Sequence, residues 1–157
     1  MSMISRNKRK PNGNVLVEFA LSSSLLMFLF MGTFQFGYSF YQYNTLTNAI
    51  RGGVRYASMA KISNPGNGTV PATYIDAIRN TVVYGSPVVG DSPTPIVKGL
   101  KPSDVDVTVT FDAKFVPQTV TVKVNQFVID AVVKKFTING KPSLQMPFLG
   151  QYCPVSC

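Results

Sequence analysis

One carboxylate stands at the start of the longest apolar run in the chain. Glu18 directly precedes Phe19, and no charged residue occurs between Phe19 and Ile50. An ionised carboxylate beside a bilayer is costly, so Glu18 is a candidate functional residue. The alternative is that its side chain merely extends to the membrane interface.

A glycine five residues before Glu18 indicates what this carboxylate would do. Gly13 precedes Asn14, and a glycine lets an extended backbone enter a protease groove without a side-chain clash. Cleavage after Gly13 would make Asn14 the new amino terminus and Glu18 the fifth residue of the mature chain. In a helical assembly Glu18 would then pair with the terminal ammonium of a neighbouring subunit, and pairing makes a buried charge tolerable.

The apolar core of this run, Phe19–Tyr41, predicts a membrane-spanning helix. At about 1.5 Å per residue, the helix is long enough for a hydrocarbon layer of roughly 30 Å. The run is longer than the apolar region of a secretory signal peptide, and no convincing A-x-A site closes it, so we expect it to remain as an anchor. The basic cluster Arg6–Lys10 predicts a cytoplasmic N-terminus and an extracytoplasmic chain after about Tyr43.

The composition argues against nucleic-acid binding and catalysis. Of 157 residues, 15 are basic and 7 acidic, but four of the positive charges fall within Arg6–Lys10. A basic tail directly before an apolar run is more often a topology signal than a phosphate-binding patch. Histidine, the commonest general base, is absent. We identify no nucleophile, base and oxyanion site, and therefore expect neither an enzyme nor a cofactor.

The two cysteines, Cys153 and Cys157, lie at the C-terminal end. Such a pair in an exported domain predicts a small disulfide loop, with free thiols as the alternative. Two soft ligands are too few for a structural zinc site.

The exported part predicts a small α+β domain. Thr73 to Tyr84 has apolar residues at helical spacing, with Thr73 as the expected cap and Gly85 as the stop. Two segments alternate with period two, Val105–Phe111 and Thr119–Val124, which predicts an antiparallel hairpin with Pro117-Gln118 between its strands. Lys123 is expected to face the aspartates across this pair.

Two further segments are harder to assign. Gln126 to Lys135 has apolar residues at helical spacing and is expected to form a short helix or an irregular segment. The turn signal Asn139-Gly140 predicts that Phe136–Ile138 pairs with Leu144–Met146 at a sheet edge.

Three aspartates, Asp104, Asp106 and Asp112, share one face of the first strand. Carboxylate oxygens at this spacing invite a calcium hypothesis, but calcium takes six to eight oxygen ligands. A solvated face is the favoured interpretation, and we expect no metal site.

Two motifs resemble known pilus proteins. Lys10–Phe19 resembles the processing site of type IV prepilins, in which cleavage follows a glycine and a glutamate lies five residues on. Val17-Glu18-Phe19-Ala20-Leu21 and the closing Ala49–Ala57 stretch resemble the TadE-like family of tight-adherence (Tad) pilus systems. The closing motif residues are Arg51, Gly53, Arg55 and Tyr56.

The chain departs from the family pattern at two places. Ser22-Ser23-Ser24 replaces a common proline, and Gly52 replaces a glutamate in the closing motif. The alternative interpretation of that motif is a helix end, with Gly52 and Gly53 terminating the helix and the two arginines in solvent.

Together these segments predict an α+β chain, with a long N-terminal transmembrane or pilin helix followed by a small antiparallel β-sheet head with one packed helix. We expect a basic leader over 1–13, an apolar helix over 14–60 and an exported head over 61–157. The resemblance implies a minor pilin or pseudopilin, with membrane lipid, a prepilin peptidase, other pilin subunits and the pilus assembly platform as partners. The alternatives are a retained bitopic anchor that binds a periplasmic partner and a membrane-tethered enzyme.

Overall fold

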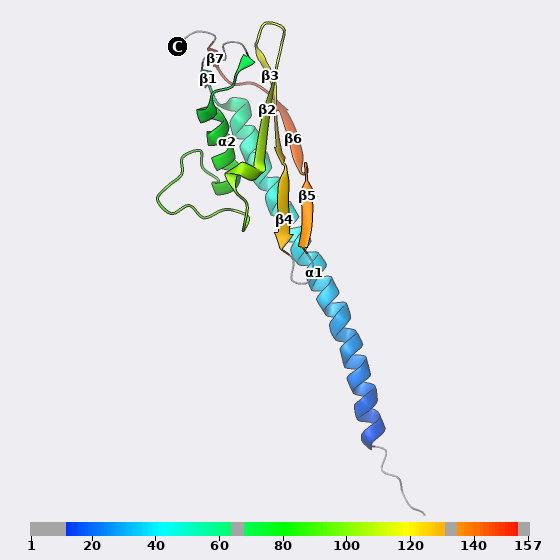
Figure 1. Ribbon diagram of the computed structural model, residues 1–157. Helices are drawn as coiled ribbons and strands as arrows, with labels where there is room; N and C mark the ends of the chain where they lie inside the picture. Colours follow the sequence, from blue (N-terminus) through cyan, green and yellow to red (C-terminus); the bar gives the residue numbers. More distant parts are fainter. Residues whose placement is uncertain (1–11, 64–67, 131–134, 154–157) are drawn as a thin grey trace, which may run out of the picture. The chain divides into compact units, whose positions relative to one another are not determined.

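The computed structural model describes residues 12–63, 68–130 and 135–153. It confirms an α+β fold with one long helix, a second helix and small antiparallel sheets (Figure 1). The chain divides into two compact units, Met1–Gly37 and Tyr38–Cys157. The expected boundaries follow secondary structure, whereas this division falls inside the first helix.

The first helix, α1, spans Asn12–Met59 without a break. Side chains at 13–34 are all exposed, and burial of one face begins at Gln42. From there the buried positions recur every three or four residues, as expected for a helix packed on one side. They are Gln42, Leu46, Ala49, Ile50, Gly53, Val54, Ala57 and Ser58.

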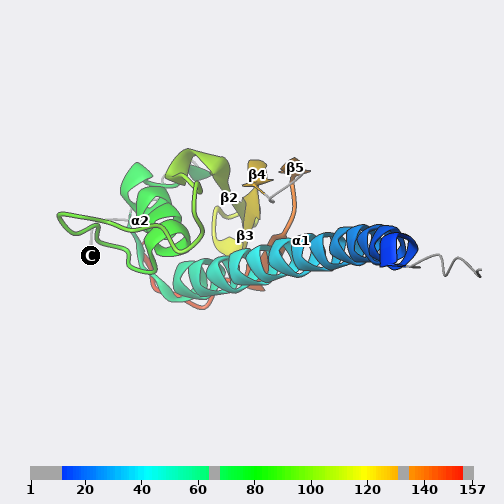
Figure 2. The same ribbon diagram turned by 90° about the horizontal axis from the view of Figure 1, so that it is seen from below.

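The second helix, α2, spans Ala72–Tyr84 and lies beside the C-terminal part of α1 (Figures 1 and 2). Tyr74, Ile78, Val82 and Val83 of α2 are buried. The predicted stop is confirmed, because Gly85 adopts the left-handed conformation and donates its N–H to the Thr81 carbonyl at 3.0 Å. The predicted cap is wrong. The helix begins one residue earlier, so the N-cap is Pro71, which makes no side-chain cap.

A three-stranded antiparallel sheet has the order β2-β3-β6. Its strands are β2 (Val105–Phe111), β3 (Pro117–Val124) and β6 (Ser143–Pro147). The predicted hairpin is confirmed, with Val107 opposite Val122. Its turn lies earlier than expected, between Asp112 and Val116, and Pro117 already belongs to β3.

Two sequence predictions about the next segment are wrong. Gln126–Asp130 forms a strand, β4, which pairs with β5 (Lys135–Asn139). Phe127 and Ile129 are buried while Val128 between them is exposed, so a period of two overrides the helical spacing. Strand β6 pairs with β3 instead of β5, with Leu144 opposite Val122.

Shorter elements complete the head unit. The 3-10 helix η2 (Pro102–Asp104) follows an irregular segment whose Val97 and Leu100 are buried. Strands β1 (Ile62–Ser63) and β7 (Tyr152–Cys153) pair in parallel. Leu149 N–H donates to the Ser58 carbonyl at 2.8 Å, which fixes the C-terminal segment at the end of α1. One hydrophobic core joins α1, α2 and both larger sheets.

Candidate processing and assembly site

The predicted cleavage site lies in the first turn of α1. Gly13 and Asn14 are the second and third residues of the helix, and both are exposed. A Cβ at Gly13 would meet no atom within 4 Å. The first four N–H groups of a helix have no partner inside it, so this turn opens at the cost of few hydrogen bonds. Extending the backbone around Gly13 therefore breaks few hydrogen bonds and leaves the rest of the helix intact.

Glu18 lies one helical turn after Asn14, because four residues separate them in a continuous helix. Its carboxylate makes no ion pair with any residue in the described ranges, and its neighbour Phe19 is 71% exposed. The residues around it, Val15, Leu16 and Val17, are also exposed. The arrangement therefore offers an uncovered carboxylate on the same helix face as the expected new amino terminus.

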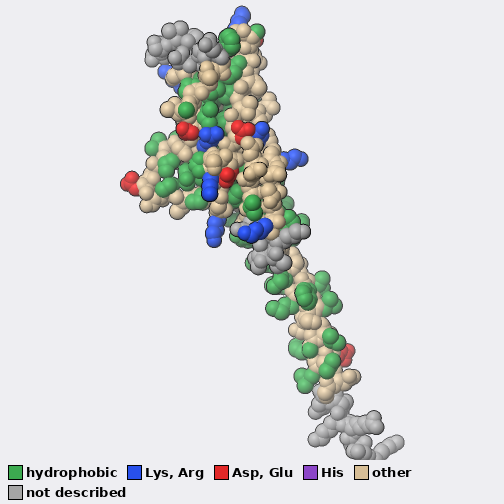
Figure 3. Space-filling model, viewed as in Figure 1, with side chains coloured by type: hydrophobic (Ala, Val, Ile, Leu, Met, Phe, Trp, Pro, Cys, Tyr) green, Lys and Arg blue, Asp and Glu red, His purple; other side chains and the backbone are tan. Residues whose placement is uncertain are grey.

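Two hydroxyl groups in the apolar part of α1 are satisfied by the helix itself. Ser24 Oγ donates to the Leu21 carbonyl, and Thr33 Oγ1 donates to the Leu29 carbonyl, each at 2.9 Å. Such bonds remove the cost of placing a hydroxyl in hydrocarbon. Figure 3 shows hydrophobic side chains along this part of the helix. Helix α1 is long and apolar enough to cross a membrane, and its most apolar window is not buried in the described structure.

The closing motif lies in the buried half of α1. Gly53 is buried, and a Cβ there would overlap Val82 of α2. Tyr56 packs partly buried against the core, whereas Arg51 and Arg55 are exposed. The alternative that Gly52 and Gly53 end the helix is wrong, because α1 continues to Met59. The buried residues of the motif therefore form part of the contact between α1 and α2, and the two arginines lie on the outer face of α1.

The tyrosine at the start of α2 reinforces this contact. Tyr74 Oη donates to the Ala57 carbonyl at 2.5 Å across the helix pair. Burial raises the pKa of Tyr74 well above its usual value, and the nearby Tyr56 raises it further. The hydroxyl is therefore held in its neutral, donating form.

The three aspartates of the calcium hypothesis have separate partners. Asp104 Oδ2 accepts the Lys101 N–H at 3.0 Å, and Asp106 pairs with Lys123 at 3.1 Å. Asp112 accepts the N–H of Ala113 at the hairpin turn. Within the described ranges, no group of three or more His, Cys, Asp or Glu residues could hold a metal ion. The expected contact of Lys123 with an aspartate is confirmed.

The predicted disulfide lies outside what the structure describes. Cys153 contributes backbone to β7, and Cys157 falls beyond the last described residue. The disulfide stays a prediction.

One feature of the head unit was missed by sequence reasoning. Gln42 is 8% exposed and lines a cavity of about 400 Å³. Its position four residues before the buried Leu46 was the available signal, because both fall on one face of α1.

Comparison with protein families gives one match. The family model described as TadE-like protein matches residues 13–55, which begins at the predicted cleavage glycine and ends within the closing motif. Comparison with curated proteins and with solved structures gives no match. The resemblance seen in the sequence is thereby confirmed: residues 13–55 of this chain are similar to the TadE-like family.

Proposed function

We propose that the chain is a minor pilin or pseudopilin of a Tad-type adhesive pilus. It is inserted in the bacterial inner membrane with its N-terminus in the cytoplasm and its head outside. A prepilin peptidase cleaves it between Gly13 and Asn14, and the mature chain joins other pilin subunits through the assembly platform. The observation that carries the proposal is the TadE-like match, which starts at Gly13. It falls on an apolar helix whose residues 13–34 are all exposed.

The role in assembly depends on Glu18. After cleavage, the ammonium of Asn14 enters an apolar environment, where an unpaired charge costs several kcal/mol. Glu18 of a neighbouring subunit neutralises it. Residues 13–34 are exposed all round the helix, so they offer apolar surface to lipid before assembly and to neighbouring helices afterwards.

A structural role for the head fits what the described residues show. The closing motif and Tyr74 hold α2 against α1, and the head core is built on the second half of α1. Because the head is built on α1, a subunit carries its head into any assembly that its helix joins. The proposal is therefore a structural role in assembly and not a catalytic one.

Replacing Glu18 by glutamine tests the assembly role. Glu18→Gln keeps the shape of the side chain but cannot neutralise an ammonium, so incorporation should fall by about tenfold or more while cleavage persists. The measurement compares the amount of trimmed chain in membranes with the amount in sheared pili. Asp91→Asn removes an exposed carboxylate of the head and serves as the control. Wild-type incorporation of the Glu18→Gln chain would contradict the pairing.

A further inference from the structure

The turn of the β2–β3 hairpin exposes an aromatic side chain. Two hydrogen bonds of 2.9 Å close this turn, from the Phe115 N–H to the Asp112 carbonyl and from the Asp112 N–H to the Val116 carbonyl. Phe115 is 50% exposed, and Val116 beside it is 39% exposed. Two neighbouring apolar side chains therefore lie in solvent on a turn that its own hydrogen bonds hold in place.

The backbone of Phe115 is unusual for its residue type. Its φ is 58°, in the left-handed region, and glycine is the preferred residue at this position of a three-residue hairpin loop. A bulky residue in this region is an outlier, and such residues cluster at functional sites. The ring lies close to Gly68, where an added Cβ would be only 3.2 Å from it. The chain thus presents a phenyl ring where local structure favours glycine, which indicates that the ring itself has a use.

The other end of the hairpin carries a cavity of about 400 Å³. Asp104 directly precedes β2, Gln126 comes shortly after β3, and both residues line the cavity. Figure 1 shows the turn at one end of β2, and η2 and β4 at the other end. At about 3.3 Å per residue, β2 separates the turn from the cavity by about 20 Å. Phe115 therefore cannot enter the cavity of its own chain.

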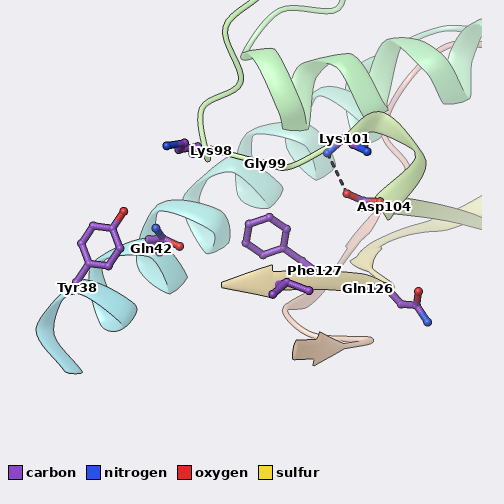
Figure 4. A pocket seen from close by; sticks show the side chains of 9 residues that line it. Tyr38, Gln42, Lys98, Gly99, Lys101, Asp104, Gln126 and Phe127 are labelled. Atoms are coloured by element: carbon purple, nitrogen blue, oxygen red, sulfur yellow. Dashed lines mark hydrogen bonds between the residues drawn. The ribbon is translucent and has the colours of Figure 1, made fainter. Parts of the chain in front are cut away.

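The cavity offers apolar surface between charged groups. Phe127 lies in its middle, with Lys98 on one side and Asp104 on the other (Figure 4). Val128, which is 44% exposed, adds apolar surface to the lining. The volume falls within the range of about 300–1,000 Å³ that is typical of ligand pockets, so an aromatic side chain fits. Aromatic residues that fill such pockets dominate the energetics of protein interfaces.

The charges of the turn and of the cavity are complementary. Asp112 and Lys114 are exposed at the turn, and neither makes an ion pair within the described ranges. Lys98 and Lys101 of the cavity are exposed and equally without an ion pair there. The carboxylate of Asp104 accepts hydrogen bonds from a backbone N–H and a hydroxyl, both of them neutral groups. Each surface therefore carries charged groups of both signs that the other surface can neutralise.

We propose that the hairpin turn of one copy of this chain docks in the cavity of a second copy. Phe115 fills the middle of the cavity. Asp112 pairs with Lys98, and Lys114 pairs with Asp104. A second copy is the partner because both complementary surfaces belong to this chain.

The contact is heterologous, because the turn and the cavity are different surfaces at opposite ends of one hairpin. A heterologous contact that does not close into a ring repeats from copy to copy and builds an open, helical array. Both surfaces belong to the compact unit Tyr38–Cys157. The inference therefore requires neither cleavage after Gly13 nor insertion of α1 in a membrane.

Photocrosslinking from the turn tests the contact directly. The full chain carries p-benzoylphenylalanine in place of Phe115 and is mixed, in mild detergent with added lipid, with an isotopically labelled chain. Mass spectrometry should find crosslinks from residue 115 to labelled peptides that contain residues 98–101 or 126–128. The same probe at Val88, an exposed apolar residue that does not line the cavity, should give no such crosslink. Crosslinks from residue 115 to other segments, or to lipid alone, would overturn the proposal.

Variants of the two surfaces separate docking from folding. Phe115→Gly removes the ring at a position that glycine favours, so the temperature of unfolding should be kept or raised. Self-association should nevertheless weaken by about tenfold or more, because the aromatic anchor is lost. Val128→Asp places a charge in the cavity from an exposed position and should weaken association to a similar extent. Val88→Ala is the control, and sedimentation velocity of the full chain in detergent measures all three.

Mixing the two variants tests whether the contact is heterologous. The Phe115→Gly chain keeps an intact cavity, and the Val128→Asp chain keeps an intact turn. Their equimolar mixture should form heterodimers, but no longer assemblies, that neither variant forms alone. A mixture without heterodimers, or wild-type association by either variant alone, would overturn the proposal. If the mature chain nevertheless begins at Asn14, that result contradicts this inference and leaves the proposed function intact.

Discussion

Leu26 and Leu46 lie on the same helix, but Leu26 is 69% exposed and Leu46 is fully buried. The half of α1 before Gln42 is exposed on every side at residues 13–34, and its most apolar window is not buried in the described structure. In the half from Gln42 onward only one face is buried, and the opposite face carries Arg51 and Arg55. The two halves of α1 therefore suit different environments. The distribution of apolar residues around the helix distinguishes the two halves better than the number of apolar residues does.

The two leucines give the largest expected difference between the halves. Leu46→Ala leaves a cavity in the head core and should lower the free energy of unfolding by about 2–5 kcal/mol. Leu26→Ala removes a side chain that no described residue covers and should leave head stability unchanged. Thermal unfolding of the full chain in detergent, followed by near-ultraviolet circular dichroism, measures both. Equal effects would show that the two halves are not packed differently.

Neighbouring glycines sharpen the comparison within the second half. A Cβ at Gly53 would overlap Val82, whereas a Cβ at Gly52 would meet nothing within 4 Å. Gly53→Ala should therefore destabilise the head by about 1–3 kcal/mol through overpacking. Gly52→Ala should stabilise it by about 0.5–1 kcal/mol, because alanine is the better helix former. The same unfolding experiment decides, and a stable Gly53→Ala chain would argue against close contact of α1 with α2.

Tyr74 gives the smallest effect, and that effect depends on pH. Its pKa in the folded chain is raised above the unfolded value of about 10, so its contribution is complete below pH 10. Above pH 10 the unfolded chain loses a proton that the folded chain keeps. The free energy of unfolding then falls by up to about 1.4 kcal/mol per pH unit.

Tyr74→Phe should lower stability by about 1 kcal/mol at neutral pH and should weaken the decline above pH 10. Urea titrations of the full chain at pH 8 to 11 measure both quantities. Tyr84→Phe, at the end of the same helix, removes a hydroxyl without a hydrogen bond to a described residue and is the control. An unchanged alkaline decline in Tyr74→Phe would show that this hydroxyl is not buried on folding.

Local sequence patterns predicted the elements that depend on local rules. The alternation of Val105–Phe111 predicted β2, because burial of one face of a strand is enough to produce it. Gly85 predicted the end of α2, because its left-handed backbone conformation ends the helix. The segment after Gln126 was mispredicted because its apolar spacing fits a helix and a strand equally well. Pairing with β5 then decided in favour of the strand.

The candidate site divides in the same way. Gly13 and Glu18 were singled out from sequence because their spacing and the apolar run that follows Glu18 are local patterns. Gly53 was recognised as a motif residue, but its contact with Val82 required the fold. The cavity at Gln42 brings α1 together with segments more than 50 residues later in the sequence, which no local pattern indicates.

The amino terminus of the mature chain tests the central claim most directly. The chain is extracted from membranes of a host that has its own prepilin peptidase, and its N-terminal residues are sequenced. The proposed function predicts a start at Asn14, with Gly13→Leu blocking cleavage but not membrane insertion. A start at Met1 in the wild-type chain would contradict it and would indicate a retained bitopic anchor, and any other start would contradict the assignment of the cleavage site.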